Sequence, residues 1–187
     1  MKMNKIQYLI LLLLLSVPVF SPAQDKQPVS QNDTAKSEFK QIAQEFSSTL
    51  QGILLGELKK GGAPGAVSVC SDTALKLTAE IGKKYGVEIR RISLKNRNPK
   101  NAPRNESETN LLLKMETAEN NAAPANTITN KFFAAPIKVS APCLQCHGSE
   151  EQINPETLKK INEFYPGDKA RNYKAGDFRG AVVIERK

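Results

Sequence analysis

The longest hydrophobic pattern in the chain spans about residues 35–59. Within it, apolar residues recur at every third or fourth position, as they do on the buried face of an amphipathic helix. These residues are Phe39, Ile42, Ala43, Phe46, Leu50, Ile53 and Leu54. The pattern predicts a long helix that covers a core. The glycine- and proline-rich residues 61–65 are expected to end it, because both residue types interrupt helices.

Four shorter apolar runs predict strands, because they contain the β-branched and aromatic residues that favour sheets. They span residues 66–70, 87–93, 131–139 and 181–184. In the second run, Val87 and Ile89 are expected on the buried face together with either Ile92 or Leu94. Pro136 interrupts the third run and suggests an edge position or a bulge, since proline donates no ladder hydrogen bond.

Three further helices are predicted among these strands, over about residues 72–86, 106–120 and 155–164. Ser71 or Asp72 is expected to cap the first. In the third, Leu158, Ile161 and Phe164 should face inward. A long helix followed by strands and short flanking helices predicts an α+β fold with a small, mostly antiparallel sheet. The regular alternation of a parallel Rossmann sheet is absent from the pattern.

The first 23 residues have the three parts of a secretory signal peptide. Lys2 and Lys5 precede an apolar run over residues 9–15, and a Ser-Pro-Ala cleavage site follows. The run is short for a membrane span, so cleavage is favoured over a retained N-terminal anchor. The sequence therefore predicts export to the periplasm and no stable membrane span after cleavage. A polar linker over residues 24–34 and one domain over residues 35–187 complete this organisation.

Charge narrows the class of partner. The formal net charge of +8 falls to +6 without the first 23 residues, because these hold two lysines and no acidic group. A surplus of this size does not by itself indicate nucleic acid, and export also argues against it. We therefore expect a protein rather than nucleic acid as the partner. The composition leaves a homo-oligomer open.

One short stretch has the residues for cofactor chemistry. Cys143, Cys146 and His147 form a C-x-x-C-H motif, and His147 is the only histidine in the chain. The spacing is typical of covalent haem c attachment, in which two thiols add to the porphyrin vinyl groups and the adjacent imidazole binds the iron. A disulfide is an alternative, and so is a zinc site, which would need every cysteine and histidine of the chain. One covalent haem c is favoured, because export, spacing and histidine agree.

A second axial iron ligand would come from a short set of residues. Cys70 is the only cysteine outside the motif, and Met115 is the only methionine after residue 23. Cys70 is expected where a strand meets a helix N-terminus, which would stabilise a thiolate. Met115 lies in an apolar run that is typical of core packing. The residue chemistry favours Cys70 slightly, and Met115 or an open iron site stay as alternatives.

The most basic segment of the chain follows the predicted strand 87–93. Its cations are Arg90, Arg91, Lys95, Arg97, Lys100 and Arg104. A guanidinium matches a carboxylate at two points, so Arg91 and Arg97 are candidates to bind the haem propionates. The alternative is a solvated basic loop.

Several segments together resemble a family of exported monohaem c-type proteins, the Tll-type haem domain. The matching residues, in the same order, are 66–70, 90–95, 97–101, 135–137, 143–148, 165–166, 168–170 and 173–180. The resemblance implies a PAS-like α+β fold and covalent haem at Cys143 and Cys146. It also implies His147 as one axial ligand and Cys70 as the other.

These inferences predict a periplasmic monohaem c-type cytochrome that acts in electron transfer or redox sensing. A haem-based sensor that signals to a partner protein is the alternative. A haem enzyme that acts on sulfur compounds is disfavoured, because the sequence offers no recognisable substrate site and no catalytic residues.

Overall fold

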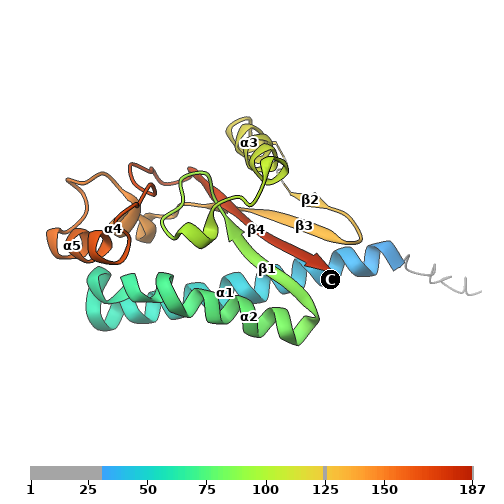
Figure 1. Cartoon of the computed structure of the whole chain (residues 1–187), viewed down its shortest axis with the longest axis horizontal. Helices are drawn as coiled ribbons and strands as arrows, with labels where there is room; N and C mark the ends of the chain where they lie inside the picture. Colours follow the sequence, from blue (N-terminus) through green and yellow to red (C-terminus); the bar gives the residue numbers. More distant parts are fainter. Residues whose placement is uncertain (1–30, 124–125, 187) are drawn as a thin grey trace, which may run out of the picture.

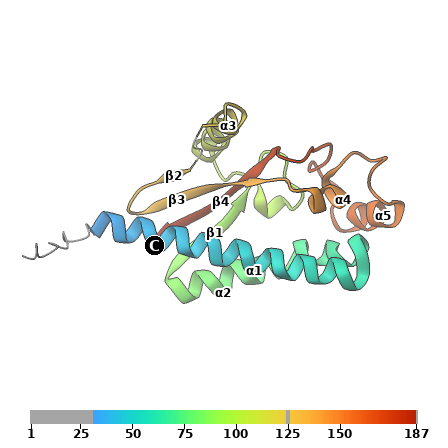
Figure 2. The same cartoon turned by 180° about the vertical axis from the view of Figure 1, so that it is seen from behind.

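The computed structural model describes residues 31–123 and 126–186, without the side chains of residues 31, 32, 68, 70 and 71. A long helix, α1 (Gln31–Ser68), and α2 (Ala74–Tyr85) lie along one face of a twisted sheet, and α3 (Glu106–Asn120) lies on the other (Figures 1 and 2). The predicted signal peptide and residues 24–30 of the predicted linker fall outside the described residues, and the last linker residues already belong to α1.

The sheet consists of β1 (Val87–Ile92), β2 (Thr127–Ile128), β3 (Phe132–Lys138) and β4 (Phe178–Arg186). Its order is β1-β4-β3-β2, and every neighbouring pair is antiparallel. The predicted PAS-like α+β fold, with a long N-terminal helix and a mostly antiparallel sheet, is confirmed. The short strand β2 lies outside the four runs that predict strands.

Alternate side chains of the central strand β4 enter two separate hydrophobic clusters, as the pleat of a strand requires. Val182 and Ile184 pack against α1 and α2, whereas Ala181 and Val183 pack with α3. β1 behaves in the same way, because Val87 and Ile89 belong to the first cluster and Ile92 to the second. Ile92 rather than Leu94 is therefore the third buried residue of this strand, and it faces α3.

The strand predicted over residues 66–70 is wrong. Gly62 takes a left-handed φ of 62° and kinks α1 where the pattern predicts its end. The chain then stays helical, since Pro64 stands in the first turn after the kink, where its missing N–H has no helical partner to lose. A π-helix, η1 (Val69–Thr73), joins α1 to α2, so the predicted caps Ser71 and Asp72 lie inside helical backbone.

Pro136 has both of the features expected for it. It pairs with Ala181 of β4 on one side, and β2 reaches only Phe133 and Ala134 on the other. A register shift follows between Ile137 and Lys138.

No helix among the described residues is both long and apolar enough to span a bilayer.

Between β3 and β4 the chain leaves the sheet for residues 139–177. This excursion contains η3 (Ala141–Cys143), α4 (Leu144–His147) and α5 (Pro155–Phe164), and it reaches the far end of α1 (Figure 1). Val139 closes its base, because its N–H donates to Asp177 and its carbonyl accepts from Gly176. Within α5, Ile161 is buried as predicted, but Phe164 is 50% exposed, so its predicted inward orientation is wrong.

Candidate functional site

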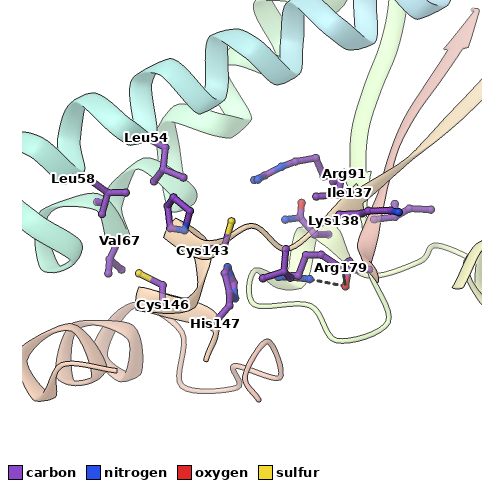
Figure 3. A pocket seen from close by; sticks show the side chains of 16 residues that line it. Leu54, Leu58, Val67, Arg91, Ile137, Lys138, Cys143, Cys146, His147 and Arg179 are labelled. Carbon is purple, nitrogen blue, oxygen red and sulfur yellow. Dashed lines mark hydrogen bonds between the residues drawn. The ribbon is translucent and has the colours of Figure 1, made fainter. Parts of the chain in front are cut away.

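A cavity of about 190 Å³ lies where the excursion meets α1 and the end of the sheet. Leu54 and Leu58 of α1 and Val67 beyond the kink supply apolar walls (Figure 3). A hollow of about 350 Å³ adjoins it along α1. The two share Leu54, Arg91, Ile137, Lys138, Pro142 and Cys143.

Cys143, Cys146 and His147 all line this cavity. Cys143 ends η3 and Cys146 lies in α4, so a three-residue spacing on successive helical residues brings both thiols toward the same space (Figure 3). Gly148 ends the turn, where a Cβ would lie 2.8 Å from the Leu144 carbonyl oxygen. Cys143 and Cys146 are not joined by a disulfide, and no described group of three His, Cys, Asp or Glu residues could hold a metal ion.

The imidazole of His147 is fixed in one tautomer. Its Nδ1 lies 2.7 Å from the carbonyl oxygen of Ala170. Because a carbonyl can only accept, Nδ1 bears the hydrogen and Nε2 keeps its lone pair. Burial, with the charges of Arg97 and Arg179, lowers the pKa of His147 to about 3. At neutral pH the ring is therefore uncharged, and the hydrogen bond at Nδ1 orients it, as in many metal-binding histidines.

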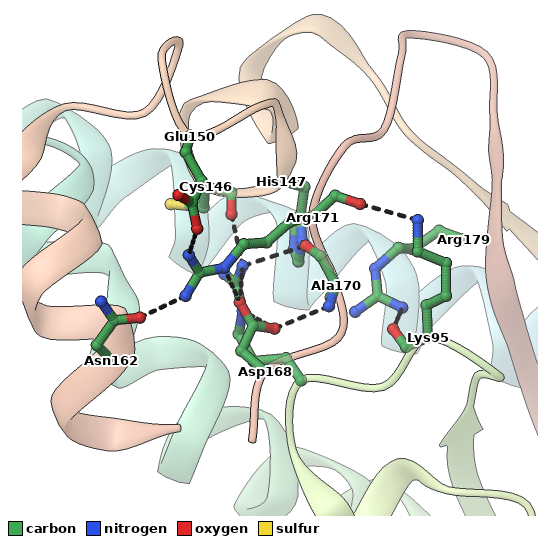
Figure 4. Close-up of polar contacts among 10 residues, drawn as sticks. Lys95, Cys146, His147, Glu150, Asn162, Asp168, Ala170, Arg171 and Arg179 are labelled. Atoms are coloured by element: carbon green, nitrogen blue, oxygen red, sulfur yellow. Dashed lines mark hydrogen bonds and ion pairs between the residues drawn. The ribbon is translucent and has the colours of Figure 1, made fainter. Parts of the chain in front are cut away.

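A buried ion pair lies behind the motif and holds it from the backbone (Figure 4). Arg97 Nε and Nη2 each donate to one carboxylate oxygen of Asp168 at 3.0 Å, and both side chains are almost fully buried. The same Nη2 donates to the carbonyl oxygens of Cys146 at 2.5 Å and Ala170 at 3.2 Å. The pair thus contacts one cysteine of the motif and the carbonyl that orients His147.

Arg171 extends this network to the surface. Its Nε donates to Asp168 at 3.0 Å, and its two terminal nitrogens donate to Glu150 and Asn162 (Figure 4). Burial alone would raise the pKa of Asp168, but the hydrogen bonds and charge of Arg97 outweigh burial and lower it. Asp168 therefore stays ionised beneath the motif.

The sequence model of the Tll0287-like family matches residues 23–186. This chain belongs to the Tll0287-like family. Among solved structures, the crystal structure of the cyanobacterial heme-protein Tll0287 is similar to it, with a TM-score of 0.60 and 23% sequence identity. The similarity covers 80% of this chain and 94% of that one, and at this identity it shows the fold alone. No curated protein matches the chain.

In this Tll0287-like protein Arg91 and Arg97, the two candidates to bind haem propionates, lie in different places. Arg91 lines the cavity, as do Lys138 and Arg179. Arg97 instead lies behind the motif, where Asp168 occupies its guanidinium. Asp168 was not a predicted site residue, and the signal that marks it is the resemblance over residues 168–170.

The two candidate second ligands are also separated. Met115 is buried with Leu112 and Val183 in the hydrophobic cluster between the sheet and α3, which we call the α3-side cluster. Leu54 and Leu58 of the cavity lie across the sheet from it. The backbone of Cys70 lies in η1, but its side chain is outside the described residues. Ala66 and Val67, which lead into η1, line the cavity.

Proposed function

We propose that this Tll0287-like protein is a periplasmic monohaem c-type cytochrome that acts in electron transfer or redox sensing. One observation carries the proposal: the two motif thiols and the imidazole of the chain's only histidine line a single cavity. Haem supplies one-electron redox chemistry when bound. The description of the similar Tll0287 as a heme-protein supports the same cofactor here.

The cavity suits a covalently held tetrapyrrole. Its apolar walls, formed by Leu54, Leu58 and Val67, match the faces of a porphyrin. Cys143 and Cys146 provide the two thiols, and neutral His147 provides the proximal nitrogen. Propionate carboxylates require cations, and Arg91 on the cavity wall is one candidate.

We propose Cys70 as the second axial ligand. Its backbone lies in a π-helix, a feature frequent at functional sites, and this turn follows two residues that line the cavity. The burial of Met115 in the α3-side cluster argues against the thioether alternative. A thiolate favours ferric iron and lowers the reduction potential, whereas a thioether raises it.

Covalent haem attachment is tested by mass. The chain is produced in cells that mature c-type cytochromes, and the denatured protein is weighed by mass spectrometry. We expect one haem mass added to the wild type and none added to the Cys143→Ser/Cys146→Ser variant. A wild type without added mass would refute the proposal.

The axial ligands are tested by electron paramagnetic resonance of the ferric protein. We expect a low-spin thiolate signal in the wild type. Cys70→Ala should lose this signal, and the matched control Met115→Leu should keep it. An unchanged low-spin spectrum in Cys70→Ala would show that the thiolate is not the ligand.

Electron transfer and signalling to a partner protein differ in their response to reduction. A sensor changes conformation with redox state, whereas a carrier keeps its shape. Hydrogen exchange of the ferric and ferrous forms separates the two: equal protection over residues 139–177 favours electron transfer, and a difference there favours sensing.

A further inference from the structure

Arg179 lies on the cavity wall in a fixed orientation. Its Nη1 donates to Ser93 Oγ at 2.7 Å and to the Lys95 carbonyl oxygen at 3.0 Å. The Ser93 hydroxyl in turn donates to the Arg179 carbonyl oxygen at 2.7 Å. The guanidinium also lies over the ring of Tyr173, 5.4 Å from its centroid. These contacts hold the side chain from the segment just after β1 and from the end of the excursion.

No described carboxylate lies within ion-pair distance of the Arg179 guanidinium, in contrast to those of Arg97 and Arg90. Arg97 pairs with Asp168, and Arg90 pairs with Glu108. Burial lowers the pKa of Arg179, which reflects the cost of keeping its charge away from water. A cation in this setting is normally compensated by an anion.

The cavity offers no anion of its own. None of the described residues that line it is acidic. Arg91 and Arg179 contribute positive charge, whereas the ammonium of Lys138 pairs with Glu119. These cations lie on the sheet side of the cavity, whereas Leu58, Val67 and Cys146 lie on the helix side (Figure 3). The cavity is therefore apolar around Cys146 and cationic on the opposite side, and Cys143 lies between the two.

We propose that Arg179 binds a carboxylate of the group that fills the cavity, namely a haem propionate. The inference rests on the proposed function and adds a binding residue to it. In a porphyrin the vinyl groups that react with cysteine and the propionates occupy opposite edges, which agrees with the separation of Cys146 from Arg179 here. The guanidinium suits this role because it can donate to both oxygens of one carboxylate.

The test uses the haem-loaded, full-length protein, after its mass has confirmed covalent haem. Resonance Raman spectroscopy then follows the propionate bending band, whose position reports the hydrogen bonds of these carboxylates. We expect Arg179→Leu to shift this band. Arg179→Lys should shift it less, because lysine keeps the charge but loses the two-point geometry. The control is Arg104→Leu, an exposed arginine that pairs with Glu88 and should leave the band unchanged.

Reduction of the iron gives a second measurement. Loss of the Arg179 charge should lower the equilibrium ratio of reduced to oxidised protein by about tenfold, which is 59 mV for one electron. An unshifted Raman band in loaded Arg179→Leu would overturn the inference while leaving the proposed function intact. If Arg179→Leu does not load, Arg179→Lys decides, and an unshifted band there overturns it as well. A wild type without covalent haem would overturn both.

Discussion

The buried pair of Arg97 and Asp168 predicts a large loss of stability when the carboxylate is removed. Asp168 is 1% exposed and Arg97 is 6% exposed, so Asp168→Ala leaves a buried guanidinium without its counter-ion. Breaking one partner of such a pair costs about 3–5 kcal/mol. The variant also removes the carboxylate that accepts hydrogen bonds from the Ala170 N–H at 2.9 Å and from Arg171 Nε at 3.0 Å.

Urea unfolding followed by circular dichroism measures this loss. We expect the free energy of unfolding to fall by about 3–5 kcal/mol, and the melting temperature by roughly 6–20 °C for a chain of this size. The control is Glu57→Ala, which breaks the exposed i,i+3 pair with Lys60 and should cost less than about 1 kcal/mol. The double variant Arg97→Met/Asp168→Leu should lose less than Asp168→Ala, because it leaves no uncompensated charge.

Two results would refute this reasoning. One is a loss of unfolding free energy below about 1 kcal/mol in Asp168→Ala, since removing one partner of a buried ion pair is expected to cost about 3–5 kcal/mol. The other is a double variant that loses as much stability as the single variant or more. Either result would mean that Arg97 and Asp168 do not stabilise the fold as a buried ion pair.

The same carboxylate predicts a pH dependence. The pKa of Asp168 in the folded protein lies below its ordinary value of 3.8, so the unfolded chain binds the proton more tightly. The stabilisation is therefore complete above about pH 3.8 and is lost as the pH falls through the folded-state pKa. The difference in unfolding free energy between the wild type and Asp168→Ala should be constant near neutral pH and shrink in acid. A constant difference down to pH 2 would contradict this.

Further predictions concern glycine and the excursion, and urea unfolding measures each. Gly180 has a φ of 143°, and a Cβ there would lie 2.2 Å from the Ile92 carbonyl oxygen, so Gly180→Ala should cost at least about 2 kcal/mol. Gly52 lies in α1 with open space around it, so Gly52→Ala should stabilise by about 0.5–1 kcal/mol. Ile161→Ala should cost about 2–5 kcal/mol because the side chain is fully buried. Phe164→Ala should cost less than Ile161→Ala, and a larger cost would contradict the observed exposure of Phe164.

Local periodicity was sufficient to predict most elements. The pattern over residues 35–59 predicts the first part of α1, and similar patterns predict α2, α3 and α5, because each amphipathic face is encoded within a few turns. The C-x-x-C-H motif could also be recognised from the sequence, since its spacing is a local property.

The strand predicted over residues 66–70 failed because a short apolar run fits a buried helix as well as a strand. Tertiary contacts decide between the two. Val67 packs in a cluster with Ile153 and Ile161, so the helical path after Gly62 buries it against the excursion. That partner lies more than 80 residues later in the chain, beyond the reach of any local pattern.

Basic side chains were harder still, because charge alone does not reveal a partner. Arg91 and Arg97 are six residues apart in one basic segment, yet one lines the cavity and the other is bound by Asp168. Arg179 stood outside the predicted set because it lies in a different segment. Its position on the cavity wall depends on the pairing of β4 with β1.

The position of β4 between β1 and β3 determines when the sheet can form during synthesis of the chain. β1 and β3 each pair with β4 and not with each other, so neither has its main partner until residues 178–186 have been added. Cys143 and Cys146 precede that strand and therefore emerge before the sheet can close. During this interval the completed sheet cannot yet enclose either thiol. Closure of the sheet then fixes the base of the excursion and encloses the motif.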